Sequence, residues 1–209
     1  MVLDAAVTRM HTLTDGPPDS PHIYLFAHGA GGAMDTPFME TIARGMGERG
    51  VRVVRFEFPY MAARRTSGKR GAPDRAPVLL ETFRQLIAEH GGGDKVFVGG
   101  KSMGGRMASM VADEAGVRGL ICLGYPFHPP GKPAQTRTAH LEHLRTPALI
   151  VQGERDPFGT PADVAAYTLS PAIRIEWLAG GDHSLKGDAN LTRAIDVATD
   201  FIRRGWRQA

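Results

Sequence analysis

The sequence contains one cysteine, Cys122, so no disulfide can form within the chain. Its neighbours are apolar, which indicates a buried strand position rather than a redox-active or nucleophilic thiol. The chain also lacks any run near the ~18 consecutive apolar residues that a membrane span requires, and no basic stretch followed by a long apolar run stands at its start. We therefore expect a cytoplasmic protein without membrane attachment.

The sequence also lacks a large excess of charge of one sign, because it contains 25 lysines and arginines and 22 aspartates and glutamates, which give a formal net charge of +3. Much of the positive charge lies in residues 64–75, where aromatic residues do not alternate with the basic ones and no groove-reading motif appears. We expect no nucleic-acid partner. With 42% hydrophobic and 22% charged residues, the 209 residues suffice for a single domain, 1–209, with its own core.

Short β-branched runs alternate along the chain with longer amphipathic stretches, a pattern typical of βαβ units and a mostly parallel sheet with helices on both faces. The expected strands are residues 23–27, 51–56, 95–98, 117–123, 148–152 and 173–178. The expected helices, which carry apolar residues at helical spacing, are residues 37–49, 77–90, 103–115, 161–169 and 191–204.

Two further segments complete the expected α/β fold. Residues 5–13 could add an antiparallel edge strand before the first parallel strand. Residues 59–77 combine glycine, proline and basic residues, which predicts a long mobile loop between a strand and a helix. Most other connections are short and leave no room for a large lid domain.

The segment Gly100-Lys101-Ser102-Met103-Gly104 lies between an expected strand and an expected helix, which is the context of a nucleophile elbow. A serine on such a sharp turn projects its hydroxyl freely, and glycines flank it because side chains there would collide with the neighbouring backbone. The exposed N–H groups at the start of the following helix favour negative charge at the reaction centre. We predict that Ser102 is a catalytic nucleophile.

A serine hydroxyl is a weak nucleophile and needs a histidine to accept its proton and an acid to orient that histidine. His183 follows the last expected strand, and Asp156 lies in the turn after residues 148–152, where parallel sheets place their sites. Glu154 is the alternative acid. Each residue alone could be an ordinary loop residue, but the order Ser, Asp, His after three different strands predicts a catalytic triad.

The loop 28–32, His28-Gly29-Ala30-Gly31-Gly32, follows the first expected parallel strand and lets the backbone approach a ligand closely. We predict an oxyanion hole formed by the backbone N–H groups of Ala30 and Met103, with His28 shaping the loop. The spacing does not match the Gly-x-Gly-x-x-Gly pattern of dinucleotide-binding loops.

Residues expected to contact substrate come from two loops. The predicted set comprises Gly29, Gly31, Phe127 and His128, the last two lining an acyl pocket. The basic segment is either a solvated surface excursion or part of the substrate site. In the second case it would favour anionic acyl substrates, with the cations drawn from Arg64, Arg65, Lys69 and Arg70.

Together these motifs resemble the α/β-hydrolase superfamily, and within it the small, lid-less dienelactone-hydrolase-like members. The set is similar to a group of predicted hydrolases related to a chromatin-complex subunit and a testis-expressed protein, and the resemblance covers nearly the whole chain. It rests on residues 28–32, 99–105, 124–129, 152–159 and 181–183. The resemblance implies an eight-stranded, mostly parallel sheet with the elbow after the fifth strand, and the triad Ser102, Asp156 and His183.

The expected function is hydrolysis of an ester or thioester of a small acyl substrate through an acyl-serine intermediate, without a cofactor or metal. Dienelactone hydrolases use a cysteine nucleophile, so their lactone specificity does not extend to a chain with Ser102 at the elbow. Two alternatives remain. Some relatives of the chromatin subunit act as interaction modules, which suggests a non-catalytic protein, and the same triad could serve an acyltransferase or a small peptidase.

Overall fold

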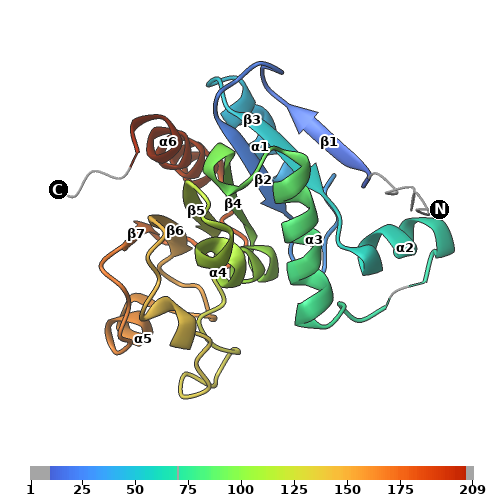
Figure 1. Ribbon diagram of the computed structural model, residues 1–209. Helices are drawn as coiled ribbons and strands as arrows, with labels where there is room; N and C mark the ends of the chain where they lie inside the picture. The colour runs from blue at the N-terminus through green and yellow to red at the C-terminus, as the bar shows by residue number, and fades with distance from the viewer. Residues whose placement is uncertain (1–9, 70, 206–209) are drawn as a thin grey trace.

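The computed structural model describes residues 10–69 and 71–205, which form one twisted sheet with helices on both of its faces (Figure 1). Seven strands in these residues follow the spatial order β1-β3-β2-β4-β5-β6-β7. They are β1 (Thr12–Asp15), β2 (Ile23–Ala27), β3 (Arg52–Phe56), β4 (Val96–Lys101), β5 (Gly119–Leu123), β6 (Ala148–Gly153) and β7 (Ile173–Leu178). β1 pairs antiparallel with β3, and all other pairs are parallel.

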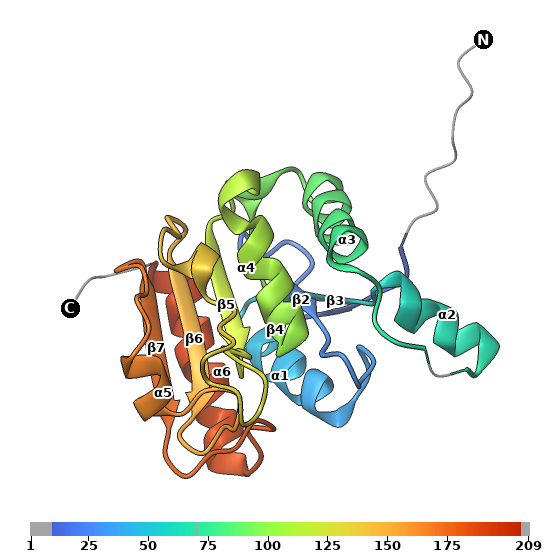
Figure 2. The ribbon, with the colours of Figure 1, turned by 90° about the horizontal axis from the view of Figure 1, so that it is seen from below.

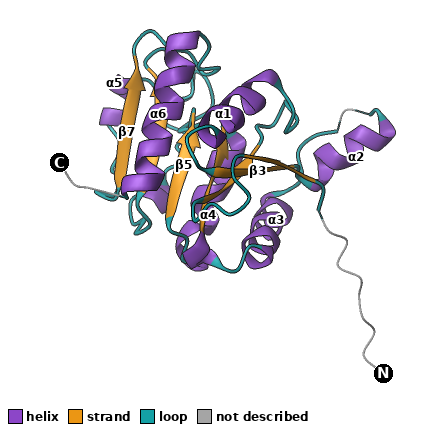
Figure 3. Ribbon diagram, turned by 90° about the horizontal axis from the view of Figure 1, so that it is seen from above, coloured by secondary structure: helices purple, strands orange, loops and turns teal. Residues whose placement is uncertain are grey.

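Helices cover both faces of the sheet, and the second of them along the chain extends away from it (Figures 2 and 3). They are α1 (Pro37–Gly47), α2 (Pro59–Ser67), α3 (Ala76–Glu89), α4 (Met103–Ala115), α5 (Pro161–Ala165) and α6 (Asp188–Arg204), with 3-10 turns at Gly93–Lys95 and Ala139–Leu141. α3 and α4 cover one face, and α1 and α6 cover the other. None of the helices in residues 10–69 and 71–205 has the length and apolar character to cross a bilayer.

The alternation of side chains along β2 shows how the sheet divides the core. Tyr24 and Phe26 pack with the apolar faces of α1 and α6, whereas Leu25 and Ala27 pack toward α3 and α4. All four side chains are fully buried. A strand covered on both faces is apolar at nearly every position, which explains why β2 and β5 are continuous hydrophobic runs in the sequence.

Cys122 lies in β5 and is buried, as predicted. Its thiol donates a hydrogen bond of 3.4 Å to the carbonyl of Gly105 in α4. Burial raises the pKa of the thiol, so the reactive thiolate is disfavoured.

The loop predicted over residues 59–77 is wrong in its first half, because α2 occupies that part. Pro59 fixes the backbone at the first helical position, and the buried Met61 anchors the helix. Gly68 ends it in a left-handed conformation with φ 68° and donates its N–H to the carbonyl of Arg64. The basic residues between these signals masked the helix in the sequence.

The predicted antiparallel edge strand is present as β1, which begins at Thr12 and so overlaps the end of the predicted range 5–13, while residues 5–9 of that range lie outside the described residues. The seven strands of the described part put the elbow after the fourth strand, not after the fifth of eight. Two helix ends move as well. α5 stops at Ala165 instead of residue 169, and α6 begins at Asp188, three residues earlier than predicted.

The parallel strands bring their carboxyl ends to one edge of the sheet. The segments that leave β2, β4, β6 and β7 at this edge contain, in order, His28, Ser102, Asp156 and His183. Four segments distant in the sequence thus meet at one place, as open parallel sheets place their ligand sites.

Candidate active site

Ser102 forms the turn between β4 and α4, with φ 51° and ψ −113°. It is one of two non-glycine residues with positive φ in the described part of the chain. The turn fits because two glycines allow close approach. A Cβ at Gly100 would lie 2.6 Å from the carbonyl oxygen of Ala27, and one at Gly104 would lie 2.6 Å from that of His28. The sequence thus forms a tight elbow that holds the Ser102 hydroxyl away from the sheet.

The three residues predicted as a triad lie within hydrogen-bond distance of one another. The Ser102 hydroxyl is 2.9 Å from Nε2 of His183, and Nδ1 of His183 is 2.7 Å from Oδ2 of Asp156. Because a carboxylate only accepts hydrogen bonds, Nδ1 carries the proton and donates it to Asp156. Nε2 is then free to accept a hydrogen bond from the Ser102 hydroxyl.

Asp156 is completely buried, and its two oxygens are occupied by donors. Oδ2 also accepts a hydrogen bond of 2.9 Å from the Gln152 amide, and Oδ1 accepts one of 2.8 Å from the backbone N–H of Phe158. The Phe158 ring packs on the His183 imidazole with 4.3 Å between ring centroids. The carboxylate and the imidazole are therefore fixed before any substrate arrives.

Glu154, the alternative acid, does not contact His183. Its Oε2 accepts a hydrogen bond of 2.9 Å from the N–H of Gly180, and the neighbouring Arg155 binds the Gly180 carbonyl through Nε at 2.8 Å. These two residues hold the loop that carries His183, so Asp156 alone takes the position of the orienting acid.

The loop after β2 is held by the side chain of His28. Its Nδ1 lies 2.7 Å from the carbonyl of Gly29, and its Nε2 accepts from the N–H of Phe58 at 3.2 Å. Burial lowers the pKa of His28, which favours the neutral ring that this bonding needs. Ala30 lines the cavity beside Ser102, and the N–H of Met103 begins α4, where helical N–H groups have no partner within the helix.

Tyr60 in α2 also contacts this loop, which the sequence did not suggest. Its hydroxyl donates a hydrogen bond of 3.0 Å to the carbonyl of Ala30, and its ring lies 5.7 Å from the ring of His28. Burial raises the pKa of the phenol to about 12, so it remains a donor at physiological pH. Turning this carbonyl toward Tyr60 fixes the peptide plane next to the predicted oxyanion donor.

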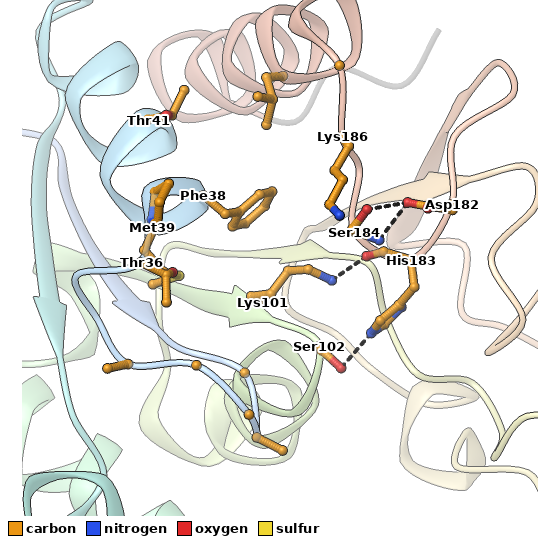
Figure 4. A pocket seen from close by; sticks show the side chains of 18 of the residues that line it. Thr36, Phe38, Met39, Thr41, Lys101, Ser102, Asp182, His183, Ser184 and Lys186 are labelled. Atoms are coloured by element: carbon orange, nitrogen blue, oxygen red, sulfur yellow. Dashed lines mark hydrogen bonds between the residues drawn. The ribbon is translucent and has the colours of Figure 1, made fainter.

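A cavity of about 830 Å³ opens beside Ser102 and His183 (Figure 4). Gly29 and Gly31 line it as predicted, together with α1 residues such as Phe38. Phe127 and His128 are buried and do not line it. The sequence placed them correctly after β5, but the Phe127 ring packs against Tyr125 and the backbone of Gly159 in the core. The prediction that they form the acyl pocket is therefore wrong.

The basic segment does not reach the cavity either. Arg65 forms ion pairs of 2.7 Å with Glu57 and 2.8 Å with Asp35, and neither it nor Arg64 nor Lys69 is among the lining residues. Arg70, the fourth residue predicted there, lies outside the described residues. The charge of Arg65 holds α2 against the segment before α1 instead of facing a substrate.

Lys101, the variable residue inside the elbow motif, does line the cavity. Its Nζ donates a hydrogen bond of 2.6 Å to the carbonyl of His183. Burial lowers the pKa of this ammonium to about 8, although Asp156 and Asp182 act in the opposite direction. Lys101 therefore links the nucleophile turn to the histidine loop through one contact.

Comparison with known proteins agrees with this fold. The family model described as alpha/beta hydrolase domain matches residues 20–202. Dienelactone hydrolase from Anabaena variabilis superposes with a TM-score of 0.72 at 19% identity, covering 94% of this chain and 92% of its own. The esterase domain of a Rhodothermus marinus protein superposes with a TM-score of 0.70 at 18% identity, covering 94% of this chain and 98% of its own.

A third structure is similar in the absence of a lid. An α/β serine hydrolase without lid from Xanthomonas campestris gives a TM-score of 0.65 at 20% identity and covers 93% of this chain and 86% of its own. At these identities the solved structures support the fold, and the family model supplies the assignment. The chain belongs to the alpha/beta hydrolase domain family.

Proposed function

We propose that the protein hydrolyses an ester or thioester of a small acyl substrate through an acyl-serine intermediate. The observation that carries this proposal is the hydrogen-bond series Ser102, His183, Asp156 at 2.9 and 2.7 Å, next to an open cavity. These are mutual positions that a nucleophile, a base and an orienting acid require, which supports the proposal. Esterases and hydrolases among the similar structures agree with this chemistry.

In the first half of the reaction, the Ser102 oxygen attacks the carbonyl carbon while its proton passes to Nε2 of His183. The negative charge that forms on the carbonyl oxygen is stabilised by the N–H groups of Ala30 and Met103. The carbon–oxygen or carbon–sulfur bond then breaks, and Nε2 returns the proton to the leaving alcohol or thiol. Asp156 stabilises the imidazolium that exists between these steps.

In the second half, a water molecule attacks the acyl-serine carbonyl and gives one proton to Nε2. The tetrahedral intermediate collapses, the Ser102 oxygen leaves, and Nε2 returns the proton to it. The product is a carboxylic acid, and the enzyme regains its starting protonation state. Water can reach the acyl group because no large lid covers the cavity in the described residues.

Labelling with a fluorophosphonate tests the proposal directly. We expect one covalent adduct per chain, located on Ser102 by mass spectrometry, and release of 4-nitrophenol from its short-chain acyl esters. Protein that is unfolded by heat before labelling should form no adduct, because the serine hydroxyl of an unfolded chain is not activated. A folded protein that gives neither the adduct nor turnover would contradict the proposed function.

Replacing Tyr60 by phenylalanine should lower kcat about fivefold and leave KM nearly unchanged, since one hydrogen bond to the oxyanion loop is lost. The oxyanion loop contacts the substrate most closely in the transition state, which a bound boronic acid resembles. The affinity for a boronic acid inhibitor should therefore fall in parallel with kcat. Tyr167→Phe is the matched control, because its hydroxyl donates to the carbonyl of Pro133, away from the cavity. A change confined to KM would show that Tyr60 affects substrate binding instead.

A further inference from the structure

The cavity beside Ser102 combines apolar walls with two lysines. Phe38, Met39 and Leu191 provide apolar surface from the starts of α1 and α6. Lys101 enters from the elbow, and Lys186 comes from the segment just before α6. Figure 4 shows both side chains directed toward the part of the cavity that the catalytic serine and histidine border.

The ammonium of Lys101 is held in place from several sides. Its stem lies against Gly29, where a Cβ would be 3.6 Å from its Cγ, and its Nζ lies close to Gly124, where a Cβ would be only 2.7 Å away. The carbonyl of His183 accepts one of its three hydrogens. In the described part of the protein no hydrogen bond joins the other two N–H groups to an acceptor, and Nζ lies 5.8 Å from the centre of the Phe38 ring. These two donors are therefore available to a ligand.

Among the described residues neither lysine forms an ion pair with a carboxylate of the cavity, although the charge of Asp182 favours the protonated form of Lys101. Asp182 is the acidic residue in the lining, and its Oδ1 accepts from the N–H of Ser184 at 2.9 Å and from the hydroxyl of the same residue. Hydrogen bonding by Ser184, with a smaller contribution from Lys186, lowers the pKa of Asp182. Within residues 10–69 and 71–205, no ion pair joins Lys101 or Lys186 to a carboxylate.

We propose that the site is specific for esters that carry a second, anionic group close to the reacting carbonyl, with Lys101 and Lys186 as its counter-ions. This inference rests on the proposed function and adds the substrate class. A charged hydrogen bond formed next to apolar walls is stronger than one formed in water. A neutral substrate would leave the Lys101 ammonium partly desolvated and unpaired, whereas an anionic one would satisfy its free donors.

The anion could belong to the acyl group or to the leaving group, and three esters distinguish these sources. 4-Nitrophenyl butyrate is neutral, 4-nitrophenyl hemisuccinate carries a carboxylate on the acyl side, and 4-carboxyphenyl butyrate carries it on the leaving group. We expect kcat/KM for one of the charged esters to exceed that of the neutral ester by about tenfold or more after correction for intrinsic reactivity. The preference should shrink as salt is added. Equal values for all three would overturn the inference while leaving the serine hydrolase intact.

Lys186→Met should reduce the ratio of charged to neutral kcat/KM severalfold, and Lys101→Met should reduce it further. The ratio is the informative quantity, because Lys101 also contacts the His183 loop and its loss lowers turnover of every ester. Lys69→Met is the matched control. It removes the same charge from the basic segment, whose described residues do not line the cavity, and should leave the ratio unchanged. An equal drop in all three variants would indicate general attraction rather than a binding site.

A binding measurement decides the inference even without turnover. The Ser102→Ala protein should bind monomethyl succinate and not the neutral dimethyl succinate, as followed by NMR of isotope-labelled lysine side chains. The ammonium resonance assigned to Lys101 should titrate near pH 8 in the free protein and at a higher pH with the anion bound, because an opposite charge favours the protonated form. An unchanged titration, with no difference between the two ligands, would refute the anionic subsite.

Discussion

Ser102→Ala should lower kcat for a 4-nitrophenyl ester by about 10⁶-fold, since the residues of a triad act as a unit and the loss of the nucleophile removes the acyl-enzyme route. The hydroxyl oxygen lies 2.9 Å from Nε2 of His183, and alanine offers no alternative nucleophile there. Steady-state kinetics at high enzyme concentration measure the effect. KM should change little if substrate binding depends on the cavity walls rather than on the hydroxyl.

We expect the Ser102→Ala variant to fold, because alanine keeps the Cβ that the turn already accommodates. Circular dichroism and thermal unfolding check this. A folded Ser102→Ala protein with wild-type turnover would place the nucleophile elsewhere. The same variant addresses the interaction-module alternative, which predicts that partner binding and cellular function survive the substitution in full.

Asp156→Asn should lower kcat by about 10⁴-fold near neutral pH, because the asparagine side chain has one acceptor oxygen where the carboxylate has two. Three donors converge on Asp156: the Gln152 amide, the Phe158 N–H and Nδ1 of His183. Whichever way the new amide turns, at least one donor faces an NH₂ group, because two donors bind Oδ2 and one binds Oδ1. Either the imidazole loses its tautomer, or it keeps the tautomer and loses the charge that stabilises the imidazolium.

Glu154→Gln is the control for this prediction. Its carboxylate accepts from Gly180 and does not touch the imidazole, so a glutamine oxygen can replace it with little effect on kcat. Rates measured for both variants on one ester settle which acid orients the histidine. A loss at Glu154 comparable to that at Asp156 would mean that support of the histidine loop, not charge beside His183, governs turnover.

The sequence was sufficient to predict the triad because strand ends determine its position. Ser102 directly follows a strand, Asp156 and His183 lie in the loops that leave two others, and a parallel sheet brings these strand ends to one edge. The two-layer arrangement of helices follows from the same alternation of runs. A mostly parallel sheet with helices on both faces was therefore predictable, and the structure confirms it.

The walls of the cavity were not predictable in this way, since strand ends do not reveal on which side a loop turns. Phe127 lies after β5 at the same edge of the sheet as the triad, yet its ring is buried in the core against Gly159. Lys101 occupies a variable position of the elbow motif, and only the folded structure shows that its side chain lines the cavity. Tyr60 could not be predicted because it lies in a segment whose basic residues are typical of a solvated loop.

The positive φ of Ser102 carries a cost that bears on why the protein exists. Holding a non-glycine residue at φ 51° stores backbone strain, and glycine would adopt the same turn without it. A chain selected only as a docking scaffold would gain robustness from glycine at this position, because selection for folding alone removes such strain. Serine at the elbow is expected when selection for catalysis outweighs selection for stability, and this favours an enzyme over a non-catalytic scaffold.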